Sequence, residues 1–328
     1  MPHPRPKRPD LPGCVLAYHS VAHRLPGAAG YHAHNVPPPA FRRQAAWLAR
    51  HYQVVTLDDW MAAGDVAGLA AITFDDGYDS VFTQALPILR DLALPATVFL
   101  CDRLLRGEPY WRDLLRHLIT TGRFAAFRAF AEPAGVLAGA DLDRDPYAAT
   151  RAPAVDSARL AALLDDFVAA QVPAAELDGL RGLYRRAADL VDHPLVAYGN
   201  HTLTHPVMAS LGGDAQHAEI AGMEAVLDRL GLRRSRVFGI PFGNPGDADP
   251  ATERACAALG LTGMVYCRRA WPTPWPGPGP DAARHPGATG LPVAHRLVMP
   301  PHAIAFGPRG TALANRLRAA RNWVMGRG

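Results

Sequence analysis

Residues 69–77 read Leu69-Ala70-Ala71-Ile72-Thr73-Phe74-Asp75-Asp76-Gly77, an apolar run that stops at two adjacent carboxylates and a glycine. The run has the length and composition of a buried β-strand, which puts both carboxylates at a strand end. Taken alone, Asp-Asp-Gly is typical of a turn. Two ionised carboxylates side by side repel, however, and a bound metal ion is the simplest partner that would compensate them.

Two histidines far downstream, His201 and His205, are candidates for further metal ligands. Their spacing puts both imidazoles on one side of a helical turn or of a tight loop. A His-x-x-x-His pair alone is more often two solvated or core-edge histidines, but with an Asp at a strand end it predicts an open metal site. A metal in such a site lowers the pKa of its bound water from about 15.7 to about 7.

A general base is also needed, and the residues between the histidines do not supply one. Thr202, Leu203 and Thr204 cannot take a proton at neutral pH. One carboxylate of the Asp75-Asp76 pair can bind the metal while the other accepts the proton of the water. The sequence therefore predicts two different roles for the two aspartates.

Strand-like and helix-like segments alternate along the chain, which predicts parallel strands joined by helices. Strands are expected over residues 15–18, 69–74 and 96–100, with a short element at Val54 and Val55. An amphipathic helix is expected over residues 41–52 and a further helix over residues 81–92. The chain has 328 residues, of which 49% are hydrophobic, enough for one large α/β domain with an insertion.

Five motifs together resemble one enzyme family. They are Cys14-Val15-Leu16-Ala17-Tyr18-His19-Ser20-Val21, Ile72-Thr73-Phe74-Asp75-Asp76-Gly77-Tyr78, Pro95-Ala96-Thr97-Val98-Phe99-Leu100, Gly199-Asn200-His201-Thr202-Leu203-Thr204-His205-Pro206 and Pro241-Phe242-Gly243. In this order, over about residues 11–270, they resemble the polysaccharide deacetylases, also called NodB-homology or carbohydrate esterase family four enzymes.

The resemblance implies a distorted (β/α)7 barrel with its site at the C-terminal ends of the strands. It implies metal-dependent hydrolysis of an N-acetyl group on an amino sugar, most simply with zinc, although cobalt or nickel would suit the same ligands. By the same resemblance, Asp75 is the general base, Asp76, His201 and His205 bind the metal, and the backbone N–H of Phe242 stabilises the oxyanion.

Two positions depart from the family pattern. Many relatives carry an Arg two residues before the motif Pro, where it holds the base carboxylate, but this chain has Gly239. The partner of the base is therefore unassigned. The family's general acid is a late His, for which His295 is our candidate and His302 the alternative. His19, at the end of the first strand, either faces the cleft or only hydrogen-bonds a neighbouring loop.

The segment between the third and fourth motifs is longer than the fold requires. Residues 103–193 have helical periodicity and form an inserted subdomain that either roofs the cleft or packs outside the barrel. Residues 271–280 contain Trp271 and Trp275 among prolines, which predicts an extended loop. These tryptophans either stack on a sugar or pin the loop to the barrel. The deacetylase domain is expected to span residues 11–310.

The two ends of the chain differ from the domain between them. Residues 1–10 are rich in Pro and basic residues, which predicts a flexible tail without the apolar core of a signal peptide, so we expect a cytoplasmic protein. Residues 311–328 predict a basic amphipathic helix, which either contacts an anionic inner membrane face or docks on the barrel. The cysteines form no C-x-x-C pair and are expected to be reduced and structural.

The sequence thus favours an enzyme whose partner is an N-acetylated saccharide or glycoconjugate. No nucleic-acid-binding motif is present, and the net charge of +4 is modest. Two alternatives remain open: an amidohydrolase for a non-sugar carbon–nitrogen bond, and a catalytically silent carbohydrate-binding protein, which Gly239 and the unmatched late His motif would favour.

Overall fold

A closed parallel barrel forms the centre of the computed structural model, which describes residues 11–25, 34–268 and 284–299. Seven parallel strands follow one another around it in the order β1, β3, β4, β5, β6, β7 and β9, and β9 closes the ring by pairing with β1. These strands are β1 (Cys14–Tyr18), β3 (Leu69–Phe74), β4 (Ala96–Leu100), β5 (Val196–Asn200), β6 (Arg234–Gly239), β7 (Gly263–Arg268) and β9 (Pro292–Val298). The predicted (β/α)7 barrel is confirmed.

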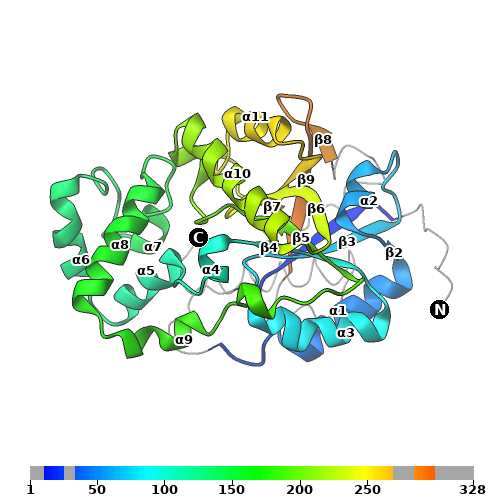
Figure 1. Cartoon of the computed structure of the whole chain (residues 1–328), viewed down its shortest axis with the longest axis horizontal. Coiled ribbons are helices and arrows are strands. Elements are labelled where there is room, and N and C mark those ends of the chain that lie inside the picture. The colour runs from blue at the N-terminus through cyan, green and yellow to red at the C-terminus, as the bar shows by residue number, and fades with distance from the viewer. Residues whose placement is uncertain (1–10, 26–33, 269–283, 300–328) are drawn as a thin grey trace.

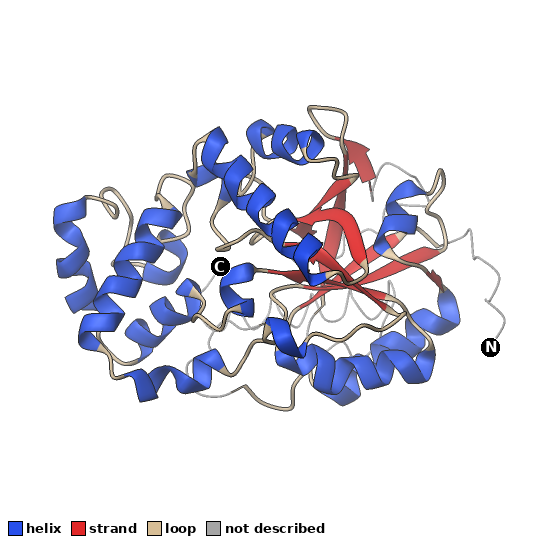
Figure 2. Ribbon diagram, in the orientation of Figure 1, coloured by secondary structure: helices blue, strands red, loops and turns tan. Residues whose placement is uncertain are grey.

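Two short strands flank the ring. Strand β2 (Gln53–Val54) pairs in parallel with β3, and β8 (Arg284–Pro286) runs antiparallel to β9. Figure 2 shows the strands enclosed by helices. The helices that pack against the barrel, around it or at its end, are α1 (Pro38–His51), α2 (Leu57–Ala62), α3 (Leu86–Leu92), α10 (Gly213–Leu230) and α11 (Pro250–Ala258).

The expected local elements are found with small shifts at their ends. The helix expected over residues 41–52 begins earlier, at Pro38, where proline suits the first turn of a helix. The helix expected over residues 81–92 starts as a π-helical turn, η2 (Val81–Ala85), and continues as α3.

Apolar side chains fill the end of the barrel that lies opposite Asp75 and Asp76. Alternate strand residues such as Val15, Ala71 and Ala294 point inward and form one buried cluster with Leu57 and Trp60 of α2. Helix α2 therefore plugs the N-terminal end of the barrel, and the C-terminal strand ends carry the polar residues.

The segment between β4 and β5, residues 101–195, is called the insertion below. Its helices are α4 (Asp102–Leu105), α5 (Trp111–Thr120), α6 (Phe124–Ala131), α7 (Pro146–Ala149), α8 (Ser157–Gln171) and α9 (Asp178–Arg181). In Figure 1, α5 to α9 form a group beside the barrel. Helices α5, α6 and α8 contact one another.

Several predicted features lie outside the described residues, namely the tail 1–10, the loop 271–280, His302 and the helix 311–328. Within the described residues, no helix has both the length and the apolar character needed to cross a membrane. All four cysteines are buried and free.

Candidate metal centre and active site

Asp75 and Asp76 follow β3 directly and point in different directions. The backbone N–H of Asp75 donates to the carbonyl of Tyr18 at 2.9 Å, which extends the pairing of β3 with β1 by one residue. Asp76 then adopts a left-handed backbone, with φ of 66°. A non-glycine residue in this conformation carries strain of about 1–3 kcal/mol and is often found at functional sites. The turn separates the two carboxylates, as two different roles would require.

His201 and His205 lie in a tight loop after β5, one of the two arrangements that their spacing allowed. The N–H of His201 donates to the carbonyl of Leu100 at 3.0 Å. The side chain of Thr202 then accepts from the N–H of His205 at 2.9 Å. Thr202 and His205 both have positive φ, 71° and 61°, so the loop folds back and brings the two rings together.

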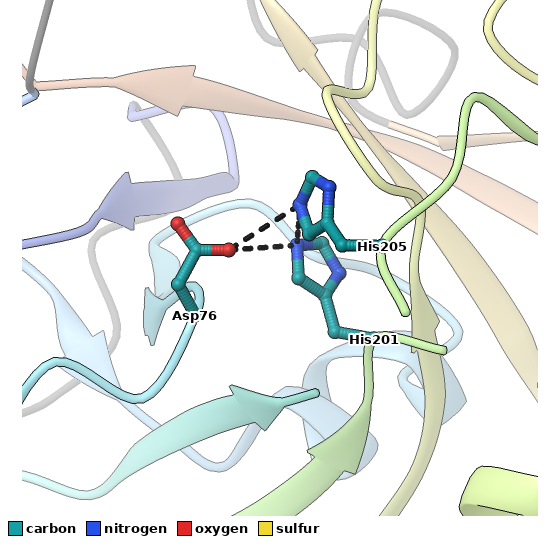
Figure 3. A group of neighbouring side chains, drawn as sticks. All are labelled: Asp76, His201 and His205. Carbon is teal, nitrogen blue, oxygen red and sulfur yellow. Dashed lines mark hydrogen bonds and ion pairs between the residues drawn. The ribbon is translucent and has the colours of Figure 1, made fainter. Parts of the chain in front are cut away.

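The three predicted ligand residues converge on one point (Figure 3). The Nε2 atoms of His201 and His205 are 3.2 Å apart, and they lie 3.6 and 3.3 Å from Oδ1 of Asp76. Tetrahedral zinc with bonds of roughly 2.0–2.1 Å would separate its ligand atoms by about 3.3–3.4 Å. Oδ1 of Asp76 is buried and has no hydrogen-bond partner among the described residues. The donor set therefore fits a divalent metal ion.

The other ring nitrogens are held by protein groups. Nδ1 of His201 is 2.6 Å from the carbonyl of Gly239, and Nδ1 of His205 is 2.9 Å from the hydroxyl of Tyr110. A bond at Nδ1 orients the ring and leaves Nε2 free for a metal.

The charge states also suit metal binding. Burial, followed by the nearby His205, lowers the pKa of His201 to about 4, so its imidazole is neutral near neutral pH. Burial alone would raise the pKa of Asp76, but the close His205 outweighs it and holds that pKa well below its usual range. A neutral imidazole and an ionised carboxylate are the forms that bind metal.

Asp75 is bound by a residue that the sequence did not single out as its partner. The guanidinium of Arg296, on β9, donates to Oδ1 and Oδ2 of Asp75 at 2.5 and 2.9 Å. Burial would raise the pKa of Asp75, but Arg296, with smaller effects of His201 and His19, lowers it below the ordinary value. Asp75 is therefore ionised near neutral pH, as a general base must be.

The space at position 239 explains why the arginine comes from elsewhere. A Cβ at Gly239 would lie only 2.7 Å from the ring of Phe99. The guanidinium of Arg296 lies over this same ring, 5.1 Å from its centroid. The Phe99 ring thus fills the place of a side chain at 239 and supports the arginine of β9. The sequence signal that could have identified this partner of Asp75 is the presence of an Arg inside the apolar run of residues 291–299.

Phe242 lies beside His205, one of the predicted metal ligands. Its backbone has a positive φ of 62°, and its ring meets that of His205 edge-on, with the centroids 4.7 Å apart. The loop after β6 therefore brings the predicted oxyanion residue next to a predicted metal ligand.

His295 does not lie with these residues. Since neighbouring strand residues face opposite sides, the inward Arg296 turns His295 outward, where its ring is 5.7 Å from that of Tyr266. This placement gives no support to a catalytic role for His295. His19, in contrast, has Nε2 at 3.8 Å from Oδ2 of Asp75, with 19% of its side chain exposed. Of the two interpretations of His19, the structure favours the one in which it faces the site.

Comparisons with known proteins agree with this architecture. Residues 65–124 match the family model for polysaccharide deacetylase. The fold resembles that of the Streptococcus pyogenes deacetylase PplD, solved with acetate, at 15% identity and a TM-score of 0.51, covering 93% of this chain and 98% of that one. It also resembles a de-N-acetylase of Aggregatibacter actinomycetemcomitans, at 15% identity and a TM-score of 0.53, covering 90% and 97%. No curated protein matches the sequence.

At this identity the solved structures establish the fold, while the family match covers the strand that carries Asp75 and Asp76. The match over residues 65–124 and the shared fold agree with the resemblance to polysaccharide deacetylases that the sequence motifs indicate.

Proposed function

We propose that this protein is a metal-dependent hydrolase that removes N-acetyl groups from an amino-sugar-containing polysaccharide, oligosaccharide or glycoconjugate. The observation that carries the proposal is the convergence of Asp76, His201 and His205 beside the Asp75–Arg296 pair. The ligand atoms have the spacing of a metal site, and the neighbouring carboxylate is ionised and rigidly held. This combination supports hydrolysis better than simple sugar binding.

In this proposal, Asp76, His201 and His205 would hold the metal ion, most simply zinc. When bound, such an ion supplies Lewis acidity and lowers the pKa of water at the site. The insertion and barrel bury all three ligands. The chain's own residues then carry the remaining tasks.

Asp75 accepts a proton from the water molecule while the water oxygen attacks the acetyl carbonyl carbon. Arg296 keeps the carboxylate ionised and fixes its direction through two hydrogen bonds. The backbone N–H of Phe242 donates to the carbonyl oxygen as negative charge develops there. Such a donor is worth about 3–4 kcal/mol.

His19 is the proposed proton donor to the leaving amine. Its Nε2 lies 3.8 Å from Asp75, on the partly exposed side of the site, where a substrate nitrogen can approach. Breakdown of the tetrahedral intermediate breaks the carbon–nitrogen bond, the amine nitrogen takes the proton of His19, and acetate leaves.

The test is acetate release by purified protein that is first stripped of metal and then refilled with zinc or cobalt. The substrates are N-acetylglucosamine oligomers and an aryl acetate ester, and His205→Ala is the matched inactive control. Release from the oligomers that depends on metal supports the proposal. Release from the ester alone would support the amidohydrolase alternative. Oligosaccharide binding without any acetate release, with metal bound, would support the silent carbohydrate-binding protein.

A further inference from the structure

The insertion contacts the predicted metal centre with the start of its second helix, α5. Tyr110 and Trp111, at the start of α5, are both buried, with 5% and 0% of their surface exposed. The hydroxyl of Tyr110 is 2.9 Å from Nδ1 of His205, and the indole N–H of Trp111 donates to the carbonyl of His205 at 2.9 Å. One histidine is thus held at its ring and at its backbone by neighbouring residues of the insertion.

These two bonds act on a residue that needs support. His205 has a left-handed backbone, with φ of 61°, which is unfavourable for a side chain with a Cβ. The bond from Trp111 fixes the carbonyl of this strained residue. When Nε2 faces the ligand point, Nδ1 carries the hydrogen and donates it to the Tyr110 hydroxyl. The ring therefore has one preferred orientation.

The far end of the insertion binds the turn that follows Asp76. The N–H of Arg185 donates to the carbonyl of Gly77, and the N–H of Asp79 donates to the carbonyl of Leu183, both at 2.9 Å. The guanidinium of Arg185 also pairs with Asp79 at 2.7 Å. These bonds hold the turn that immediately follows Asp76.

A buried polar group connects the two ends inside the insertion. The hydroxyl of Tyr184 donates to Asp113 of α5 at 2.6 Å, and Asp113 forms a buried ion pair with Arg116. The same hydroxyl lies 3.3 Å from that of Tyr78, next to Gly77. The start of α5 and the segment that holds the aspartate turn are therefore linked directly.

We propose that the insertion is a structural part of the metal centre, in which the hydroxyl of Tyr110 positions the ring of His205 so that Nε2 faces the metal. This inference rests on the proposed function in one respect, that His205 binds a metal ion. It departs from both interpretations of the sequence, in which the insertion only roofs the cleft or packs outside the barrel. Tyr110 is a positioning residue, because it acts on substrate only through His205.

The test compares Tyr110→Phe with Tyr147→Phe. Each removes a single hydroxyl from the insertion and keeps the ring, but that of Tyr147 accepts from Arg116, not from a ligand histidine. The zinc affinity of the metal-free proteins is measured by competition with a chromophoric chelator. Loss of a partner that orients a ligand typically weakens metal binding about 10–100-fold, which is the effect expected for Tyr110→Phe. The affinity of Tyr147→Phe should equal that of wild type.

A second measurement separates positioning from a general loss of structure. The visible absorption of bound Co²⁺ depends on ligand geometry, so Tyr110→Phe should change the spectrum while its metal-free melting temperature stays that of Tyr147→Phe. Wild-type affinity and an unchanged spectrum in Tyr110→Phe would overturn the inference.

The same assay distinguishes this failure from failure of the proposed function. His205→Ala must lose zinc binding if the metal centre exists. If His205→Ala bound zinc as wild type does, the metal centre and the proposed function would both fall. If only Tyr110→Phe matched wild type, the proposed function would stand without the inference.

Discussion

Arg296 and Asp75 lie 221 positions apart in sequence and form a buried ion pair in which two guanidinium nitrogens bind the two carboxylate oxygens. Strand pairing brings them together, because β1 lies between β3, which leads into Asp75, and β9, which carries Arg296. Arg296 also donates to Thr73 at 3.2 Å, one inward position before Asp75. The arginine thus spans the inside of the closed barrel and depends on its closure.

Replacing Arg296 with Met should change the pH dependence of activity. Burial raises the pKa of Asp75 and Arg296 opposes it, so without Arg296 the pKa rises and the base is protonated at higher pH. The acid limb of kcat/KM should therefore move to higher pH. The measurement is a pH–rate profile with Arg234→Met, at the start of β6, as control. An acid limb at the same pH in Arg296→Met and wild type would argue that Arg296 does not set the pKa of the general base.

The same substitution should destabilise the protein in a pH-dependent way. Removing one partner of a buried pair typically costs about 3–5 kcal/mol. Because the pKa of Asp75 is lowered in the folded protein, the pair's contribution is present above the unfolded value near 3.8 and is lost as pH falls through the folded value. The free energies of unfolding of metal-free wild type and Arg296→Met, measured with urea, should differ by an amount that decreases towards acid pH. A difference in the free energy of unfolding that did not change with pH would indicate that lost packing, not lost charge, destabilises Arg296→Met.

The sequence predicted the fold and the grouping of Asp76, His201 and His205 because both depend on local patterns. The apolar run before Asp75 and the spacing of His201 and His205 are visible within short windows. Arg296 was missed because its role depends on which strands become neighbours when the barrel closes. His295 was the sequence candidate for the general acid because of its late position. Side chains alternate along β9, however, so that Arg296, and not His295, points into the barrel.

Substitutions at Asp75 and at His205 should separate turnover from metal binding. Asp75→Asn keeps Asp76, His201 and His205, so zinc affinity should persist while kcat falls by about 10²–10⁴-fold, the usual range for loss of a general base. His205→Ala should instead lose zinc affinity. Chelator competition and acetate release, measured on both variants, check this difference. If Asp75→Asn hydrolysed substrate as fast as wild type, the assignment of the base would be wrong.

Two histidines provide a matched test of the proton donor. His19 approaches Asp75, whereas His295 faces away from the barrel interior towards Tyr266. Replacing His19 with Gln removes the proposed acid but leaves the three ligands, so we expect kcat to fall about 10²-fold or more with zinc affinity unchanged. His295→Gln should leave kcat near that of wild type.

The discriminating measurement compares an N-acetyl substrate with an aryl acetate ester, because a phenolate leaves without the proton that an amine requires. The loss in His19→Gln should therefore be large for the amide and small for the ester. Equal losses on both substrates would place the role of His19 before cleavage of the carbon–nitrogen bond, and a loss confined to His295→Gln would return the proton donor to β9.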